Sequence, residues 1–113
     1  MRKKLILIDL DGVLNKYKGK FDKKYIPPIN DGTLDFIKKL SIKYKIKIFT
    51  ARNLLLTANW IFKNNLQNYI EDITNIKEPC YLIIDDRCIC FDGDFTKLSN
   101  NIDNFVVYYF KNF

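Results

Sequence analysis

The sequence contains no histidine. Histidine is the usual general base near neutral pH and a frequent zinc ligand. Its absence therefore excludes His-based catalytic triads and most His-containing zinc sites. If the protein is an enzyme, its acid–base chemistry must come from carboxylates, lysine or tyrosine.

Cysteine is scarce, and long apolar runs are missing. There are three cysteines, an odd number, at Cys80, Cys88 and Cys90. This count and the lack of a secretory signal favour reduced thiols and a cytoplasmic location. Residues 89–91 are expected to form a short apolar strand rather than part of a metal site, which would need more ligands. No apolar stretch is long enough to span a bilayer, so no membrane association is expected.

The composition is that of a small globular protein with excess positive charge. Hydrophobic residues make up 48% of the 113 residues, which predicts one domain, residues 1–113, around a single core. The formal net charge of +6 suggests an anionic partner or substrate, although a lysine-rich solvated surface is the alternative. No basic block interleaved with aromatics is present, so nucleic acid is not the expected partner.

The segment KLILIDLDGVLN, residues 4–15, is the most informative part of the chain. Its apolar run is typical of a strand buried on both faces, and such a strand ends at the ligand-binding edge of a parallel sheet. Asp9 would end the strand and Asp11 would lie in the turn, where Gly12 lets the backbone curl away. Two close carboxylates raise each other's pKa unless a cation offsets them. The alternative is an ordinary turn, because Asp and Gly are frequent turn residues.

Hydrophobic periodicity predicts alternating strands and helices along the rest of the chain. The further strands are expected at residues 45–50, 72–77, 81–84 and 89–91. Helices are expected over residues 31–43 with Asn30 or Asp31 as N-cap, between Asn53 and Asn64, and from about Phe95. This alternation predicts an α/β fold, with a doubly wound (Rossmann-like) parallel sheet and helices on both faces. The pattern leaves the structure of residues 106–113 open.

In this topology the ends of three strands meet, which would bring Asp9, Asp11, Thr50 and Asp85 together. An aspartate can attack phosphorus and form an aspartyl-phosphate. Mg²⁺, which prefers oxygen ligands, would screen the two negative groups and bind Asp9, the Asp11 carbonyl and Asp85. The Thr50 hydroxyl could then donate to a phosphoryl oxygen, and Lys77 could add a fixed positive charge. Thr50 as a plain strand-end residue and Lys77 as a surface lysine are the alternatives.

The motifs DLDGVL, IFTAR, TNIKEP and LIIDDR resemble, in content and order, those of the haloacid dehalogenase (HAD) superfamily of aspartate-nucleophile phosphatases. The resemblance implies that Asp9 is the nucleophile and a metal ligand, and that Asp11 is the general acid–base. It also implies that Thr50 and Lys77 hold the phosphoryl group and that Asp85 completes a metal site of Asp9, Asp11 and Asp85. Asp86 is expected to orient Asp85 or to bind the metal through water.

The chain has no room for the cap domain found in larger HAD proteins, so the resemblance implies a capless and open site. Such a site implies a bulky phosphorylated substrate or closure by homo-oligomerisation. The motifs DLDGVL and IDDR also resemble those of small bacterial members linked to sugar or surface-polysaccharide pathways, which implies a sugar-linked substrate by analogy. Thr50, Ala51 and Arg52 are the expected substrate-binding residues, and Arg87 is a further candidate. A nucleic-acid end phosphatase and a non-catalytic binding module are the alternative functions.

Overall fold

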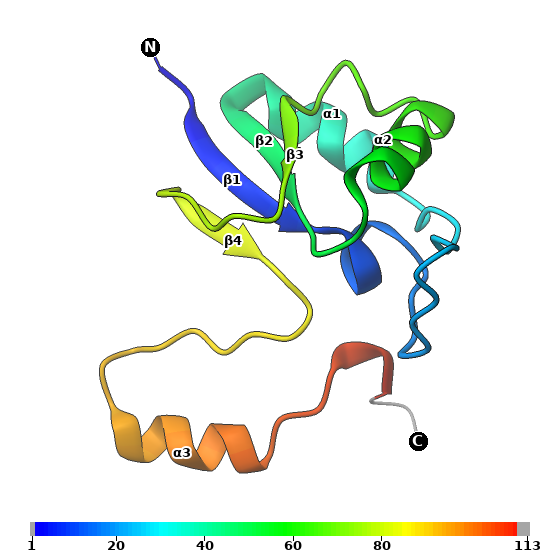
Figure 1. Cartoon of the computed structure of the whole chain (residues 1–113). Helices are drawn as coiled ribbons and strands as arrows, with labels where there is room; N and C mark the ends of the chain where they lie inside the picture. The colour runs from blue at the N-terminus through cyan, green and yellow to red at the C-terminus, as the bar shows by residue number, and fades with distance from the viewer. Residues whose placement is uncertain (1, 111–113) are drawn as a thin grey trace.

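The computed structural model describes residues 2–110, which form an α/β fold on a four-stranded parallel sheet (Figure 1). The strands are β1 Lys4–Asp9, β2 Tyr44–Phe49, β3 Asp72–Thr74 and β4 Leu82–Ile84. Their order across the sheet is β3-β2-β1-β4, so β1 lies in the interior and pairs with β2 and β4. The order reverses at β1, as expected for a doubly wound sheet. The predicted α/β class and Rossmann-like parallel sheet are confirmed.

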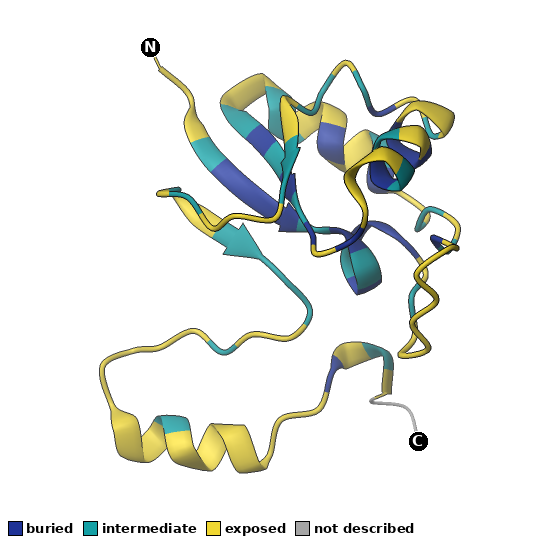
Figure 2. Cartoon of the chain, viewed as in Figure 1, coloured by how far each residue is buried: buried dark blue, intermediate teal, exposed yellow. Residues whose placement is uncertain are grey.

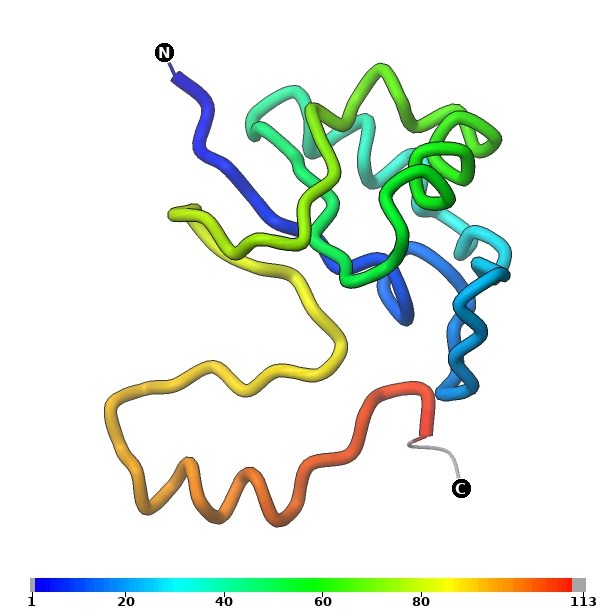
Figure 3. The backbone as a smooth tube through the Cα atoms, in the orientation of Figure 1, coloured from blue at the N-terminus to red at the C-terminus, as the bar shows by residue number. Residues whose placement is uncertain are grey.

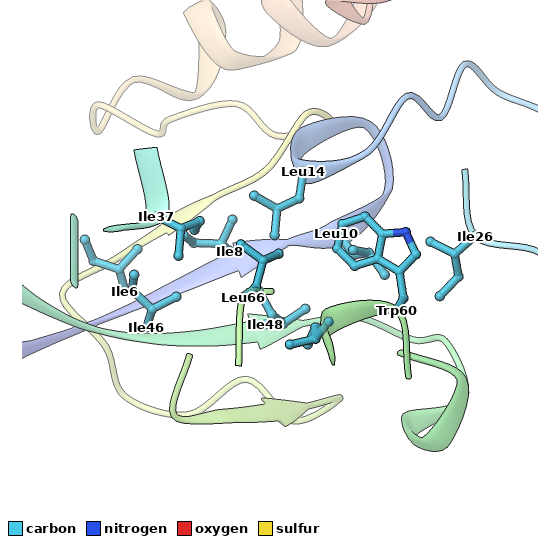
Figure 4. Close-up of a cluster of buried hydrophobic side chains, with 11 residues drawn as sticks. Ile6, Ile8, Leu10, Leu14, Ile26, Ile37, Ile46, Ile48, Trp60 and Leu66 are labelled. Atoms are coloured by element: carbon cyan, nitrogen blue, oxygen red, sulfur yellow. The ribbon is translucent and has the colours of Figure 1, made fainter. Parts of the chain in front are cut away.

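Helices α1 (Thr33–Lys43) and α2 (Leu54–Lys63) pack on the same face of the sheet. The two central strands contribute alternate isoleucines to this face, because side chains point to opposite faces in turn. Figure 4 shows these isoleucines packed with residues from both helices. The buried cluster includes Ile6, Ile8, Ile46 and Ile48 from the strands, Ile37 from α1, and Trp60 and Ile61 from α2. This layer fixes the position of the strand ends.

The prediction of helices on both faces is wrong, because the second face of the sheet is crossed by the connecting segment, residues 75–81, and not by a helix. This segment connects β3 to β4, which lie on opposite sides of β1 and β2. Lys47 points to this face and pairs with Glu78, with 2.7 Å between Nζ and Oε1. At the end of the crossing, the Tyr81 N–H donates to the Leu5 carbonyl at 2.8 Å. The connection is thereby held across β2 and β1.

The last helix, α3 (Phe95–Asp103), begins where the sequence predicted and buries none of its residues (Figure 2). The Asp94 side chain caps it by accepting from the Lys97 N–H at 3.1 Å. After α3 the chain returns in a short turn, Tyr108–Phe110, that ends beside the loop following β1 (Figure 3). The sequence left the structure of residues 106–113 undecided, and residues 111–113 of that stretch lie outside the described residues. Among residues 2–110, no helix combines the length and apolar character needed to cross a membrane.

Several predicted boundaries need correction. Helix α1 begins at Thr33 after Gly32, whose φ is 85°, and neither Asn30 nor Asp31 caps it. The Asn30 amide instead donates to the carbonyls of Val13 and Asn15. The predicted cap of α2 is confirmed, since Asn53 Oδ1 accepts from the Leu56 N–H at 3.0 Å.

Two of the predicted strands also differ from the structure. Strand β3 ends at Thr74, three residues before the predicted end. The predicted strand over residues 89–91 is wrong, because these residues are not in a strand. The chain has left the edge of the sheet there, and the described part of it offers no neighbouring strand with which these residues pair.

An acidic candidate site at the carboxyl edge of the sheet

Three carboxylates gather where β1 and β4 end. Asp9 is the last residue of β1, and Asp85 and Asp86 directly follow β4. The two strands pair with Ile8 opposite Ile84, so the next residues, Asp9 and Asp85, are also neighbours. One oxygen from each of Asp9, Asp85 and Asp86 lies within 4.8 Å of the other two. The sheet register thus creates the cluster.

The cluster is electrostatically unfavourable without a cation. Burial, together with the nearby charges of Asp85, Asp86 and Asp11, raises the pKa of Asp9 to about 8. Burial also raises the pKa of Asp85. Asp86 Oδ2 is buried and has no hydrogen-bond donor among residues 2–110. A divalent cation with oxygen ligands would offset the crowded charge and supply the missing partner, so these residues fit Mg²⁺.

Gly12 allows Asp86 to approach the turn that follows β1. This turn, Leu10–Leu14, requires a positive φ of 82° at Gly12, a conformation that other residues rarely adopt. A Cβ at this position would also clash with the Asp86 carboxylate. Glycine is therefore required at position 12 for two reasons, the conformation of the turn and the space for the Asp86 carboxylate.

The side chain of Asn15 holds the same turn by hydrogen bonds, a role that was not predicted from the sequence. Its buried side-chain oxygen accepts from the N–H groups of Gly12 and Tyr17, each at 3.0 Å. Its amide donates to Asp11 Oδ1 at 3.0 Å. The signal available in the sequence was a polar residue four positions after Asp11, at the end of an otherwise apolar turn.

Arg52 holds the other oxygen of Asp11. Arg52 Nε donates to Asp11 Oδ2 at 2.7 Å, and its side chain is 2% exposed. The guanidinium also donates to the Asp22 carbonyl at 2.9 Å and lies 4.5 Å from the centre of the Phe21 ring. The Asp11 side chain is thus bound by Arg52 and Asn15. The carboxylate cluster consists of Asp9, Asp85 and Asp86, and not of the predicted Asp9, Asp11 and Asp85. A metal contact through the Asp11 carbonyl stays a prediction.

Thr50 follows β2 at the same edge and is buried. Its backbone N–H donates to the Thr74 carbonyl at 3.0 Å, and its hydroxyl oxygen accepts from the Arg52 N–H at 3.2 Å. The hydroxyl hydrogen can still be donated to a ligand. Ala51 is exposed beside a pocket of about 550 Å³. The pocket is lined by Phe21, Lys23, Lys24, Arg52, Asn53 and Leu56, together with Ala51.

Lys77 is not brought into contact with the acidic cluster. Because β3 ends at Thr74, Lys77 lies within the crossing segment rather than at a strand end. It is exposed and forms no ion pair with a carboxylate among residues 2–110. Its role at a phosphoryl group stays a prediction. Arg87 is also exposed, and its Nη2 lies 3.4 Å from the Tyr109 hydroxyl.

Comparison with known proteins gives a likeness in structure and none in sequence. No protein-family model matches the chain, and no curated protein matches it significantly. A solved structure of a conserved protein from Bacteroides thetaiotaomicron superposes with a TM-score of 0.60 at 16% identity. The match covers 91% of this chain and 92% of that one. At this identity the likeness supports the fold alone.

Proposed function

We propose that the protein is a Mg²⁺-dependent phosphatase of the HAD type, which hydrolyses a phosphomonoester through an aspartyl-phosphate at Asp9. The observation that carries the proposal is the acidic cluster of Asp9, Asp85 and Asp86 at the carboxyl edge of the sheet. Asp11 lies two residues beyond Asp9 and is fixed by Arg52 and Asn15. This arrangement provides a nucleophile, oxygens for a cation and a second, separately held carboxylate.

In the first step, Asp9 attacks phosphorus, and the bond between phosphorus and the leaving oxygen breaks. Asp11, when protonated, gives that oxygen its proton and becomes a carboxylate. In the second step, Asp11 takes a proton from water as the water oxygen attacks the aspartyl-phosphate. Phosphate then leaves and Asp9 is restored. A bound Mg²⁺ would offset the negative charge of the phosphoryl group and of the carboxylates.

The neighbouring residues would orient the reacting groups. The Thr50 hydroxyl oxygen accepts from the Arg52 N–H, and its hydrogen would be donated to a phosphoryl oxygen. Arg52 and Asn15 each donate to one oxygen of Asp11 and hold its carboxyl group in one orientation. The exposed Lys77 would supply a positive charge to the phosphoryl group.

The surroundings favour an anionic substrate larger than a simple sugar phosphate. The pocket beside Ala51 adds Lys23 and Lys24 next to Arg52, and the chain carries a net charge of +6. We therefore propose a phosphorylated carbohydrate conjugate as the substrate class. In a homo-oligomer, a second subunit would cover the open edge of the site. A cytoplasmic location fits the three cysteines, which are all free.

The proposal is tested by release of phosphate from p-nitrophenyl phosphate with Mg²⁺ and with excess chelator. We expect release with Mg²⁺ and none with chelator. Asp85→Asn should raise the Mg²⁺ concentration needed for half-maximal activity by about tenfold or more, because it removes a charged ligand. Asp92→Asn is the matched control, since Asp92 is exposed and pairs with Lys97. Full activity in chelator would end this proposal.

A further inference from the structure

The short turn at the C-terminal end of the described chain, Tyr108–Phe110, packs against the candidate site. Val107, which precedes it, is 4% exposed and is the one buried residue of the described range 85–110. The Tyr108 hydroxyl donates to the Gly12 carbonyl at 2.5 Å. A segment separated from Gly12 by 96 residues is thus bound to the turn that holds Asp11.

The ring of Tyr109 lies beside the acidic cluster. A Cβ at Gly12 would lie 3.1 Å from Tyr109 Cε2 and would also meet the Asp86 carboxylate, so the ring stands directly beside Asp86. The ring contacts Tyr17 edge to face, with centroids 6.2 Å apart and an interplanar angle of 85°. Its hydroxyl accepts from Arg87 Nη2 at 3.4 Å. Two aromatic rings from opposite ends of the chain therefore meet at the site.

Phe110 packs on a second glycine in the loop after β1. Gly19 has a φ of 104°, and a Cβ built there would lie 2.8 Å from Phe110 Cζ. Any side chain at this position would push the Phe110 ring away. Gly12 and Gly19 thus leave the space in which the side chains of the C-terminal turn pack.

We propose that Tyr108–Phe110 covers the acidic site in place of a cap domain, and that Tyr109 with Tyr17 determines specificity by packing against the leaving group. The inference rests on the proposed phosphatase function and adds a substrate class, a phosphate ester whose leaving group contains a ring. An open strand edge contacts only the phosphate, whereas specificity requires that more of the ligand be enclosed. Aromatic side chains supply flat apolar surface against which a base, an aryl group or a sugar face can pack.

Docking of the turn is tested on the metal-free protein by hydrogen exchange of the peptide covering residues 107–110. Gly19→Ala should accelerate this exchange by about tenfold or more, because the added methyl group displaces Phe110. Gly93→Ala is the matched control, since Gly93 has a similar φ of 100° but none of the non-adjacent residues in the described chain has an atom within 4 Å of its Cβ position. If residues 107–110 exchange at the same rate in Gly19→Ala and Gly93→Ala, the inference is overturned. Any acceleration would then come from the strain of a positive φ and not from displacement of Phe110.

The specificity role is tested by the Mg²⁺-dependent binding of phenylphosphonate and methylphosphonate, which cannot be hydrolysed. The wild type should bind phenylphosphonate about tenfold more tightly, and Tyr109→Ala should abolish the preference. Tyr81→Ala should keep it, because Tyr81 stacks on Tyr44 at the amino end of the sheet. No preference in the wild type, or a preference kept by Tyr109→Ala, overturns this inference alone. Absence of both phosphonate binding and Mg²⁺-dependent hydrolysis in the wild type overturns the proposed function as well.

Discussion

Asp9→Asn is expected to lower the turnover of a phosphate ester by about 10⁴-fold or more, because an amide does not form the acyl-phosphate. The same change should stabilise the metal-free protein at pH 8. Asp9 lies among Asp85 and Asp86, and an amide at this position removes one of the crowded charges. A loss of activity together with a gain in stability distinguishes a functional carboxylate from a structural one.

The gain should depend on pH in a defined direction. Burial and the nearby charges of Asp85, Asp86 and Asp11 raise the pKa of Asp9 to about 8 in the folded protein, from 3.8 in the unfolded chain. Such a group stabilises the fold fully at low pH, and this contribution is lost as the pH rises toward 8. The amide resembles the protonated acid at every pH. The difference in unfolding midpoint between Asp9→Asn and wild type should therefore be larger at pH 8 than at pH 5.

Thermal unfolding in chelator at the two pH values measures this difference, and added Mg²⁺ should raise the midpoint of the wild type more than that of the variant. Asp103→Asn is a suitable control, since Asp103 is exposed at the end of α3 and, among residues 2–110, takes part in no ion pair and no carboxylate cluster. Asp9→Asn activity near that of the wild type would rule out Asp9 as the nucleophile. A less stable variant at pH 8 would contradict the electrostatic description of the site.

Arg52→Met is expected to destabilise the protein by about 2–4 kcal/mol, because it breaks a buried ion pair and leaves the Asp11 carboxylate without its cation. The Asp11 side chain is 19% exposed, so water recovers little of the lost interaction. The unfolding midpoint should fall by about 10 °C or more. Methionine loses the cation–π contact with Phe21 but still fills apolar space beside the ring, which limits the effect of lost packing.

In the proposed mechanism, Arg52→Met should also reduce turnover of an alkyl phosphate more than that of a nitrophenyl phosphate. The alkoxide needs the proton that Asp11 supplies, and general acid catalysis contributes about 10²–10⁴-fold only where a proton is needed. Arg2→Met is the control, since Arg2 is exposed, precedes β1 and forms no ion pair among residues 2–110. Its unfolding free energy should change by less than about 0.5 kcal/mol. Equal stability of the two variants would show that the Asp11 pair has no structural importance.

The sheet and its acidic edge were predictable because they depend on patterns local in the sequence. The apolar runs before Asp9 and Asp85 specify buried parallel strands, and neighbouring parallel strands bring their carboxyl ends together. Thr50 was placed in the same way from the strand before it. The cap at Asn53 was also found, since an asparagine before an apolar helix is a local signal.

The parts that escaped prediction depend on contacts between distant residues. Arg52 pairs with Asp11 across 41 positions, and no periodicity in either segment indicates that contact. The turn at Tyr108–Phe110 reaches Gly12 across 96 positions, and its apolar sequence fits a helix, a strand or a packed tail equally well. Lys77 was misplaced relative to its strand because DITNIK continues as a plausible strand beyond Thr74, where the chain turns to cross the sheet.

The central claim, a covalent intermediate on Asp9, is tested most directly by mass spectrometry of the acid-quenched reaction. The Asp11→Asn variant is incubated with p-nitrophenyl phosphate and Mg²⁺, then digested and compared with the wild type. Because Asp11 activates water in the second step, the variant should accumulate one phosphoryl group on the peptide that contains Asp9. Two results would contradict this account, provided that the wild type hydrolyses the ester. In the first, no peptide of the variant carries phosphate, and in the second, the phosphate is on a peptide without Asp9.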